Sequence, residues 1–302
     1  MVKSLVLENI SVGFKLPQGV FYAVDDVSLN LHGGNFTAII GESGCGKSVL
    51  GQAILNILPS GVVKKGRVLY NGEQVKKILS AFGIIPQNPS ESLNPVRKIG
   101  KQMQDILAVH NITDGDNSYK KQCLRLFGLQ EAERVLAAYP HELSGGMLQR
   151  VLCAMAVSSK PEWILADEPT KGLDEQVGAV VRKNLLTIKQ DLCLSMLIIT
   201  HDIALAQEVC DDVLVMYAGQ VLEHNADIWH KPLHPYTKGF LQALPKNGLQ
   251  VIPGKAPVPG ESFTGCNFAA RCPYCTTRCK EEMPAMQQVG NAEVRCFLYA
   301  EG

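Results

Sequence analysis

Short runs of hydrophobic residues alternate with segments of helical periodicity along most of the chain. "SLVLENISVGF" (residues 4–14) and "AVDDVSLNLHGGNFTAIIG" (residues 23–41) alternate or run apolar, and a turn is expected at residues 33–35. Continuous apolar runs follow in "FGIIPQ", "EWILADE" and "LSMLIIT". Continuous apolar strands separated by helices are typical of a parallel sheet that is covered on both faces.

Two departures from this alternation divide the chain. Helical patterning replaces the strand signal from Pro95 to about Ser158, which predicts a helical subdomain at about 88–160, inserted between two strands. Asn71-Gly72 and Ala218-Gly219 predict hairpin turns. After "HPYTKGFLQALP" the chain becomes rich in proline and glycine. We therefore expect one domain over residues 1–245, followed by a linker and a Cys-rich extension over residues 246–302.

Composition narrows the classes of function. The 302 residues carry no net charge, so no basic field is available for a nucleic-acid backbone, and we expect no nucleic-acid partner. No apolar run approaches the roughly 18 to 20 residues of a membrane helix. The start, "MVKSLVLENISVGF", is typical of a first strand and not of a signal peptide. We therefore expect the protein to lie in the reducing cytoplasm.

The stretch "GESGCGKS" fits the phosphate-loop pattern G-x4-G-K-S between a predicted strand and a predicted helix. Its glycines let backbone N–H groups turn toward phosphate oxygens, and the helix N-terminus adds its positive end. The lysine supplies a point charge and the final serine a hydroxyl for Mg²⁺. The predicted nucleotide-binding residues here are Gly41, Glu42, Ser43, Gly44, Cys45, Gly46, Lys47 and Ser48.

Two carboxylates end the buried run "WILADE". Asp167 is expected to hold Mg²⁺ and Glu168 to polarise an attacking water. A charged strand end that caps the next helix is the alternative, and the phosphate loop upstream disfavours it.

The stretch "LSGGMLQR" places a serine and two glycines at a helix start, which predicts a second anion site at Ser144, Gly145 and Gly146. A chain with two phosphate-binding stretches either binds two nucleotides or shares one across a dimer.

In order, these motifs resemble those of ABC-type ATPases over about residues 1–245. In the resemblance Gln87 matches the Q-loop, Gly172-Leu173-Asp174 the D-loop, and His201 in "ITHD" the switch histidine. Phe14, at the end of the first strand, is expected to stack on adenine, with Tyr22 as the alternative. The resemblance implies an α/β P-loop NTPase fold of ABC type. It also implies ATP and Mg²⁺ as cofactors, with Ser48, Gln87 and Asp167 as Mg²⁺ ligands, and catalysis by Glu168, His201 and Gln87. That fold has a mainly parallel sheet core, an antiparallel β-subdomain and an inserted helical subdomain.

A narrower resemblance connects "IPQNPSESLNP", "YPHELSGGM", "HPYT" and the cysteine-bearing tail to ATPase subunits of peptide and nickel importers. It implies four partners: a second ATPase subunit, two transmembrane permease subunits and an extracytoplasmic solute-binding protein. The chain would then lie peripherally on the cytoplasmic face of the cell membrane. Residues 88–110 would help form the groove for a permease coupling helix.

Two questions stay open on this resemblance, the solute (peptide or nickel) and the pairing of the cassettes (homodimer or heterodimer). A non-transport ABC ATPase is disfavoured, because only 56 residues separate Gln87 from Ser144 and no heptads appear.

Five of the ten cysteines fall in the last 37 residues. Stable disulfides are rare in the cytoplasm. Only Cys272 and Cys275 form the C-x2-C pair typical of zinc sites. The spacing Cys266-x5-Cys272-x6-Cys279-x16-Cys296 resembles the iron–sulfur tail of the importer group, and four thiolates suit a [4Fe–4S] cluster. Zinc and no metal remain alternatives, and Cys275 departs from the group's pattern.

Overall fold

The computed structural model describes residues 4–17, 19–74, 78–173, 175–244, 248, 250–257, 261 and 263–300. The chain forms two compact units. The first comprises Met1–Lys3, His32–Phe36 and Lys76–Val209, and the second comprises Ser4–Leu31, Thr37–Val75 and Cys210–Gly302. The Cys-rich extension thus belongs to the same unit as the phosphate loop, while the domain boundary expected near residue 245 stays a prediction.

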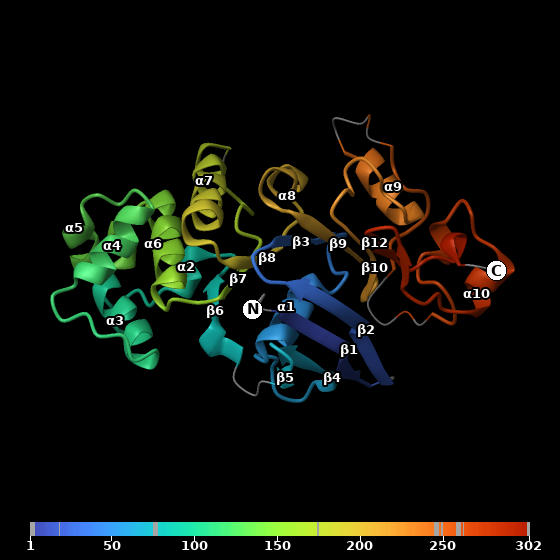
Figure 1. Ribbon diagram of the computed structural model, residues 1–302, viewed down its shortest axis with the longest axis horizontal. Coiled ribbons are helices and arrows are strands. Elements are labelled where there is room, and N and C mark those ends of the chain that lie inside the picture. Colours follow the sequence, from blue (N-terminus) through green and yellow to red (C-terminus); the bar gives the residue numbers. More distant parts are fainter. Residues whose placement is uncertain are drawn as a thin grey trace. The chain divides into compact units, whose positions relative to one another are not determined.

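The second unit begins with an antiparallel sheet in the order β2-β1-β4-β5 (Figure 1). Buried and more exposed residues alternate along much of β1, and Leu5, Leu7 and Val12 are buried on its core-facing side. The register of β1 against β4 runs from Leu5↔Tyr70 to Gly13↔Val63 with one shift after Glu8. The strands are β1 (Ser4–Leu16), β2 (Gly19–His32), β4 (Val63–Tyr70) and β5 (Glu73–Gln74).

A second sheet in this unit has the order β11-β12-β10-β9-β3. β3 runs parallel to β9, whereas β9 and β10 form the hairpin predicted at Ala218-Gly219, where both residues have positive φ. The last two strands come from the extension, so the tail joins the sheet through β12. The elements are β3 (Phe36–Gly41), α1 (Lys47–Leu55), β9 (Asp212–Tyr217), β10 (Gln220–Asn225), α9 (Pro235–Gln242), α10 (Thr277–Glu281), β11 (Gln287–Val289) and β12 (Ala292–Val294).

The first unit holds three parallel strands, with β7 between β6 and β8. β8 is buried along its whole length, as its continuous apolar run predicts. The strands are β6 (Phe82–Ile85), β7 (Trp163–Asp167) and β8 (Ser195–Ile199).

The predicted helical insertion lies between β6 and β7, where α3 and α4 pack beside α6 (Figure 1). Its helices are α2 (Pro89–Ser92), α3 (Ile99–Val109), α4 (Ser118–Leu126), α5 (Ala132–Ala137) and α6 (Gly145–Ser158). Two further helices flank β8: α7 (Glu175–Leu192) and α8 (Ile203–Val209). No helix within the described residues has the length and apolarity to cross a membrane.

His224 on β10 connects the hairpin strands to the extension. Its Nδ1 lies 3.3 Å from Glu293 Oε2 on β12, and its Nε2 lies 3.6 Å from Asp212 Oδ1 on β9. Burial opposes the charged imidazole, but the carboxylates of Asp212 and Glu293 prevail and raise the pKa of His224 from 6.5 to about 9.

We expect this histidine to make stability depend on pH. Because its folded pKa lies above the unfolded value, its contribution is complete below pH 6.5 and is lost as pH rises through about 9. Its size is about 3 kcal/mol, because the pKa rises by about 2.5 and each pKa unit corresponds to about 1.4 kcal/mol. Urea unfolding of wild type and His224→Gln at pH 6 and pH 9.5 measures the difference. Equal differences between the two proteins at both pH values would contradict the assignment.

Candidate nucleotide-binding site

The phosphate loop joins β3 to α1 in the second unit. Gly41, Gly44 and Gly46 all have positive φ, a conformation that other residues rarely adopt. At Gly46 a Cβ atom would lie 2.1 Å from the carbonyl oxygen of Ala23, so only glycine fits there. The loop geometry therefore explains the glycine spacing that the sequence shows.

Lys47 is the first residue of α1 and is buried. Its Nζ donates hydrogen bonds to the carbonyl oxygens of Gly41 (2.9 Å) and Glu42 (3.0 Å), which holds the ammonium over its own loop. Ser48 follows on the same first turn. Burial raises the pKa of the Cys45 thiol, so Cys45 stays a neutral packing residue in the loop.

A cavity of about 220 Å³ lies beside the loop and is lined by Gly44, Tyr22 and Phe263 among others. Phe14 is not one of its lining residues. The adenine-stacking role stays a prediction for Phe14, with Tyr22 as the alternative.

In the first unit, the structure brings Glu168 and His201 together. Glu168 Oε2 lies 2.6 Å from His201 Nδ1, and the side chain of Glu168 is largely buried. The backbone of Glu168 has φ 49° and its N–H donates to Ile199 O at 2.8 Å. A non-glycine residue in this left-handed region is uncommon and costs about 1 kcal/mol or more. The strained turn after β7 therefore aims this carboxylate at the histidine that follows β8.

The turn that carries His201 is itself held by hydrogen bonds. Asp202 Oδ2 accepts from Thr170 Oγ1 (3.2 Å), and Asp202 Oδ1 accepts from the N–H of Leu205 at the start of α8. The segments after β7 and after β8 are therefore connected twice, through Glu168–His201 and through Thr170–Asp202. Asp167 ends β7, directly before Glu168.

Ser144 is the N-cap of α6, as the sequence predicts, and its Oγ accepts from the N–H of Met147 at 3.3 Å. A Cβ at Gly145 or Gly146 would meet no atom within 4 Å among the described residues. The helix start therefore has room for an anion at its N–H groups.

Gln149, on the same helix, was not anticipated from the sequence. It is buried, and its Nε2 donates to the carbonyl oxygen of Pro169 at 3.3 Å. Helix α6 is thus connected to the segment that follows Glu168. The only sequence signal for this contact was that Gln149 lies on the apolar face of the segment "GMLQRVL".

The other residues predicted for the site are Gln87 and those of the expected D-loop. Gln87 follows β6 and is exposed. Gly172 of the expected D-loop has φ 73°, while Asp174 lies outside the described residues.

The four predicted cluster ligands line one cavity of about 210 Å³, and Cys275 is not among its lining residues. All four thiols are free, and Cys266 N–H donates to Cys279 O at 2.8 Å. Burial raises the pKa of Cys266 to about 11 and also raises the pKa values of Cys272 and Cys296. Within the described residues no group of three or more His, Cys, Asp or Glu side chains is arranged to hold a metal ion. The cluster therefore stays a prediction.

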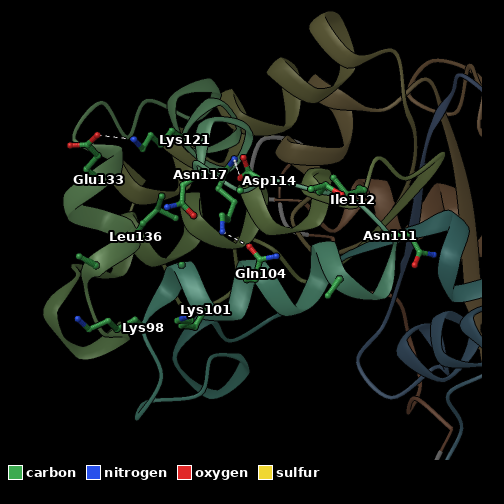
Figure 2. A pocket seen from close by; sticks show the side chains of 16 residues that line it. Lys98, Lys101, Gln104, Asn111, Ile112, Asp114, Asn117, Lys121, Glu133 and Leu136 are labelled. Atoms are coloured by element: carbon green, nitrogen blue, oxygen red, sulfur yellow. Dashed lines mark hydrogen bonds and ion pairs between the residues drawn. The ribbon is translucent and has the colours of Figure 1, made fainter.

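A broad hollow of about 1100 Å³ opens between α3, α4 and α5 (Figure 2). Several lysines line it, and two of them interact with neighbouring side chains. Lys120 Nζ donates a hydrogen bond to Gln104 Oε1, and Lys121 forms an ion pair with Glu133. None of the residues predicted for nucleotide binding lines this hollow. We assign it no part in the reaction.

Comparison with known proteins matches the chain to two protein families. Residues 24–171 match the family model described as "ABC transporter", and residues 222–279 match the one described as "Oligopeptide/dipeptide transporter, C-terminal region". The oligopeptide transport ATP-binding protein OppD of Haemophilus influenzae is 34% identical, covering 98% of this chain and 98% of that protein. The dipeptide transport ATP-binding protein DppD of Escherichia coli is 36% identical, covering 95% and 94%. A dimeric bacterial ABC transporter cassette of known structure is 25% identical with a TM-score of 0.60, covering 73% and 97%.

Proposed function

This chain belongs to the ABC transporter family of ATPases, and from that premise we propose that its transporter imports dipeptides or oligopeptides. The proposal is supported by the names of the relatives reported above, which cover nearly the whole chain, and by the match of residues 222–279. Nickel, the alternative left open by the sequence, has no comparable support among these relatives.

One observation carries the reaction that we propose: the contact between Glu168 and His201. A carboxylate held by a histidine is oriented to accept a proton from water while that water attacks the γ-phosphorus. The bond from the γ-phosphorus to the bridging oxygen then breaks, and ADP and phosphate are formed. His201 keeps the carboxylate in place, so its role is to orient the base.

The phosphate loop binds the β- and γ-phosphates through its N–H groups and Lys47 in this proposal. Ser48, Gln87 and Asp167 supply the hydroxyl, amide and carboxylate oxygens that Mg²⁺ prefers. Mg²⁺ would neutralise charge on the phosphate oxygens.

We also propose that Ser144, Gly145 and Gly146 serve ATP bound by a second ATPase subunit. The dimeric structure of the cassette described above supports pairing of this kind. The pair would act on the cytoplasmic face of the cell membrane beneath two permease subunits, with an extracytoplasmic solute-binding protein.

In this proposal, a hollow in the first unit binds a permease helix. A hollow of about 430 Å³ beside β6 is lined by Leu93, Arg97, Asp105 and His110, among others. These four residues lie in the segment 88–110, which the resemblance to importer ATPases assigns to such a groove.

Affinity capture of the tagged chain from detergent-solubilised membranes tests the proposed assembly. We expect a second ATPase subunit and two permease subunits to co-purify in fixed ratio. Recovery of the chain with ribosomes or chromosomal DNA, and without membrane subunits, would overturn the transport function.

The lining of the thiol cavity supports a further part of the proposal, a [4Fe–4S] cluster held by Cys266, Cys272, Cys279 and Cys296. A single tetrahedral ion needs its sulfurs close together, at Zn–S distances of about 2.3 Å. A cube of four irons spreads its ligands further apart. Four cysteines that line one cavity match the four thiolates that such a cluster requires.

We expect protein prepared without air to contain about four irons per chain. Cys272→Ala and Cys279→Ala should lose most of this iron, because each leaves an iron without its ligand. Cys275→Ala is the matched control and should retain it, since Cys275 does not line the cavity. Iron and zinc contents of the variants measure the outcome. One zinc per chain, or loss of iron in the control with retention in Cys279→Ala, would refute the assignment.

A further inference from the structure

The second residue of the phosphate loop is a carboxylate in a segment that binds a polyanion. Glu42 meets a positive charge from a distant part of the same unit, the Cys-rich extension. Arg271 Nη1 donates to Glu42 Oε1 at 3.0 Å and to Glu42 Oε2 at 3.1 Å. The two residues are 229 positions apart in the chain.

Arg271 is held in place from several sides. Its side chain is only 7% exposed, Nη1 also donates to Tyr217 Oη (3.3 Å), and Nε donates to Pro253 O (3.1 Å). The guanidinium lies over the rings of Tyr217 and Phe268. A buried arginine with this many fixed contacts presents its charge in one direction, toward Glu42.

The backbone of Glu42 is anchored as well. Its N–H donates to Tyr236 Oη at 3.1 Å, and the Tyr236 ring packs against Tyr217 and Phe268. One aromatic cluster therefore supports both the loop residue and the arginine that neutralises it.

Arg271 also lies next to the thiol cavity. It ends the short 3₁₀ turn Ala269–Arg271 and directly precedes Cys272. Cys266 and Cys272, on either side of this turn, both line the cavity together with Phe268. This single turn therefore connects the thiol cavity of the extension with Glu42 of the phosphate loop.

We propose that Arg271 is a positioning residue for the phosphate loop, and that tight binding of Mg·ATP requires the folded Cys-rich extension. This rests on the proposed role of residues 41–48 in binding ATP. Arg271 acts by cancelling the charge of Glu42 and by fixing the loop's second residue. Without it, an unpaired carboxylate would face the phosphates and repel them.

The test measures Mg·ATP affinity of the full chain by titration calorimetry. We expect Arg271→Met to weaken binding about tenfold, the scale of one partly buried charge interaction. Glu42→Gln alone leaves the arginine unopposed and should tighten binding about twofold to fivefold. Lys280→Met, which removes an exposed cation of the same extension in the last turn of α10, is the matched control and should bind like wild type.

The double variant Glu42→Gln/Arg271→Met separates charge from structure. If Arg271 acts by neutralising Glu42, removing the carboxylate restores most of the lost affinity, and the two changes are strongly non-additive. Arg271→Lys should restore part of it. An Arg271→Met variant that binds like wild type, or a double variant that binds as weakly as Arg271→Met, would overturn the proposal. If Lys47→Ala also leaves binding unchanged, the phosphate-loop assignment itself has failed.

Discussion

Glu168→Gln is expected to lower ATP turnover about 10²- to 10⁴-fold while Mg·ATP still binds, because the amide keeps the shape of the side chain and removes the base. An ATP-bound pair of cassettes should therefore accumulate in the assembled transporter. Single-turnover and steady-state ATPase measurements, with nucleotide affinity measured in parallel, separate the two effects.

Glu175→Gln is the matched control, because this glutamate is exposed at the start of α7 in the same unit. It should turn over ATP like wild type. Turnover near the wild-type rate in Glu168→Gln would remove Glu168 from the catalytic role, and loss of nucleotide binding in that variant would show a binding role instead.

Ser144→Arg is expected to abolish ATP turnover by the assembled transporter and to leave ATP binding by the isolated subunit nearly unchanged. The long cationic side chain would fill the helix start at which Ser144 Oγ now caps Met147 N–H. It would thereby block the approach of a second cassette. Equilibrium binding to the subunit and ATPase activity of the complex are measured on the same preparations.

Two other variants serve as comparisons for Ser144→Arg. Lys47→Ala removes the ammonium that contacts the loop carbonyl groups, so it should weaken binding by the isolated subunit itself. Ser118→Arg places the same substitution at the exposed start of another helix, α4, and should be silent. If Ser144→Arg instead lowers isolated-subunit affinity as far as Lys47→Ala does, the cross-subunit role is wrong.

Local patterns in the sequence predicted the elements that rest on local physics. The buried strands, the helical insertion and the strand–loop–helix around residues 41–48 all follow from apolar runs, helical periodicity and glycine spacing. The membership of the ABC family, predicted from the order of the motifs, is confirmed by relatives that cover nearly the whole chain.

Those local patterns could not predict contacts between segments that lie far apart in the sequence. Glu168 meets His201 because β7 and β8 pair with Asp167 opposite Ile199, a register that no local signal specifies. Arg271 pairs with Glu42 although 229 positions separate them in the sequence, and neither residue type by itself signals such a contact. The strands of the extension have three residues each, too few for a period-2 pattern to be recognised.

We propose that this chain hydrolyses ATP to drive peptide import. The direct measurement is ATP turnover by the complete transporter in lipid, with its solute-binding protein, while dipeptides, oligopeptides and Ni²⁺ are added in turn. We expect peptides to stimulate turnover and Ni²⁺ to leave it at the basal rate, with no stimulation in Glu168→Gln. Stimulation by Ni²⁺ and not by peptides, or turnover that no solute changes, would contradict the account.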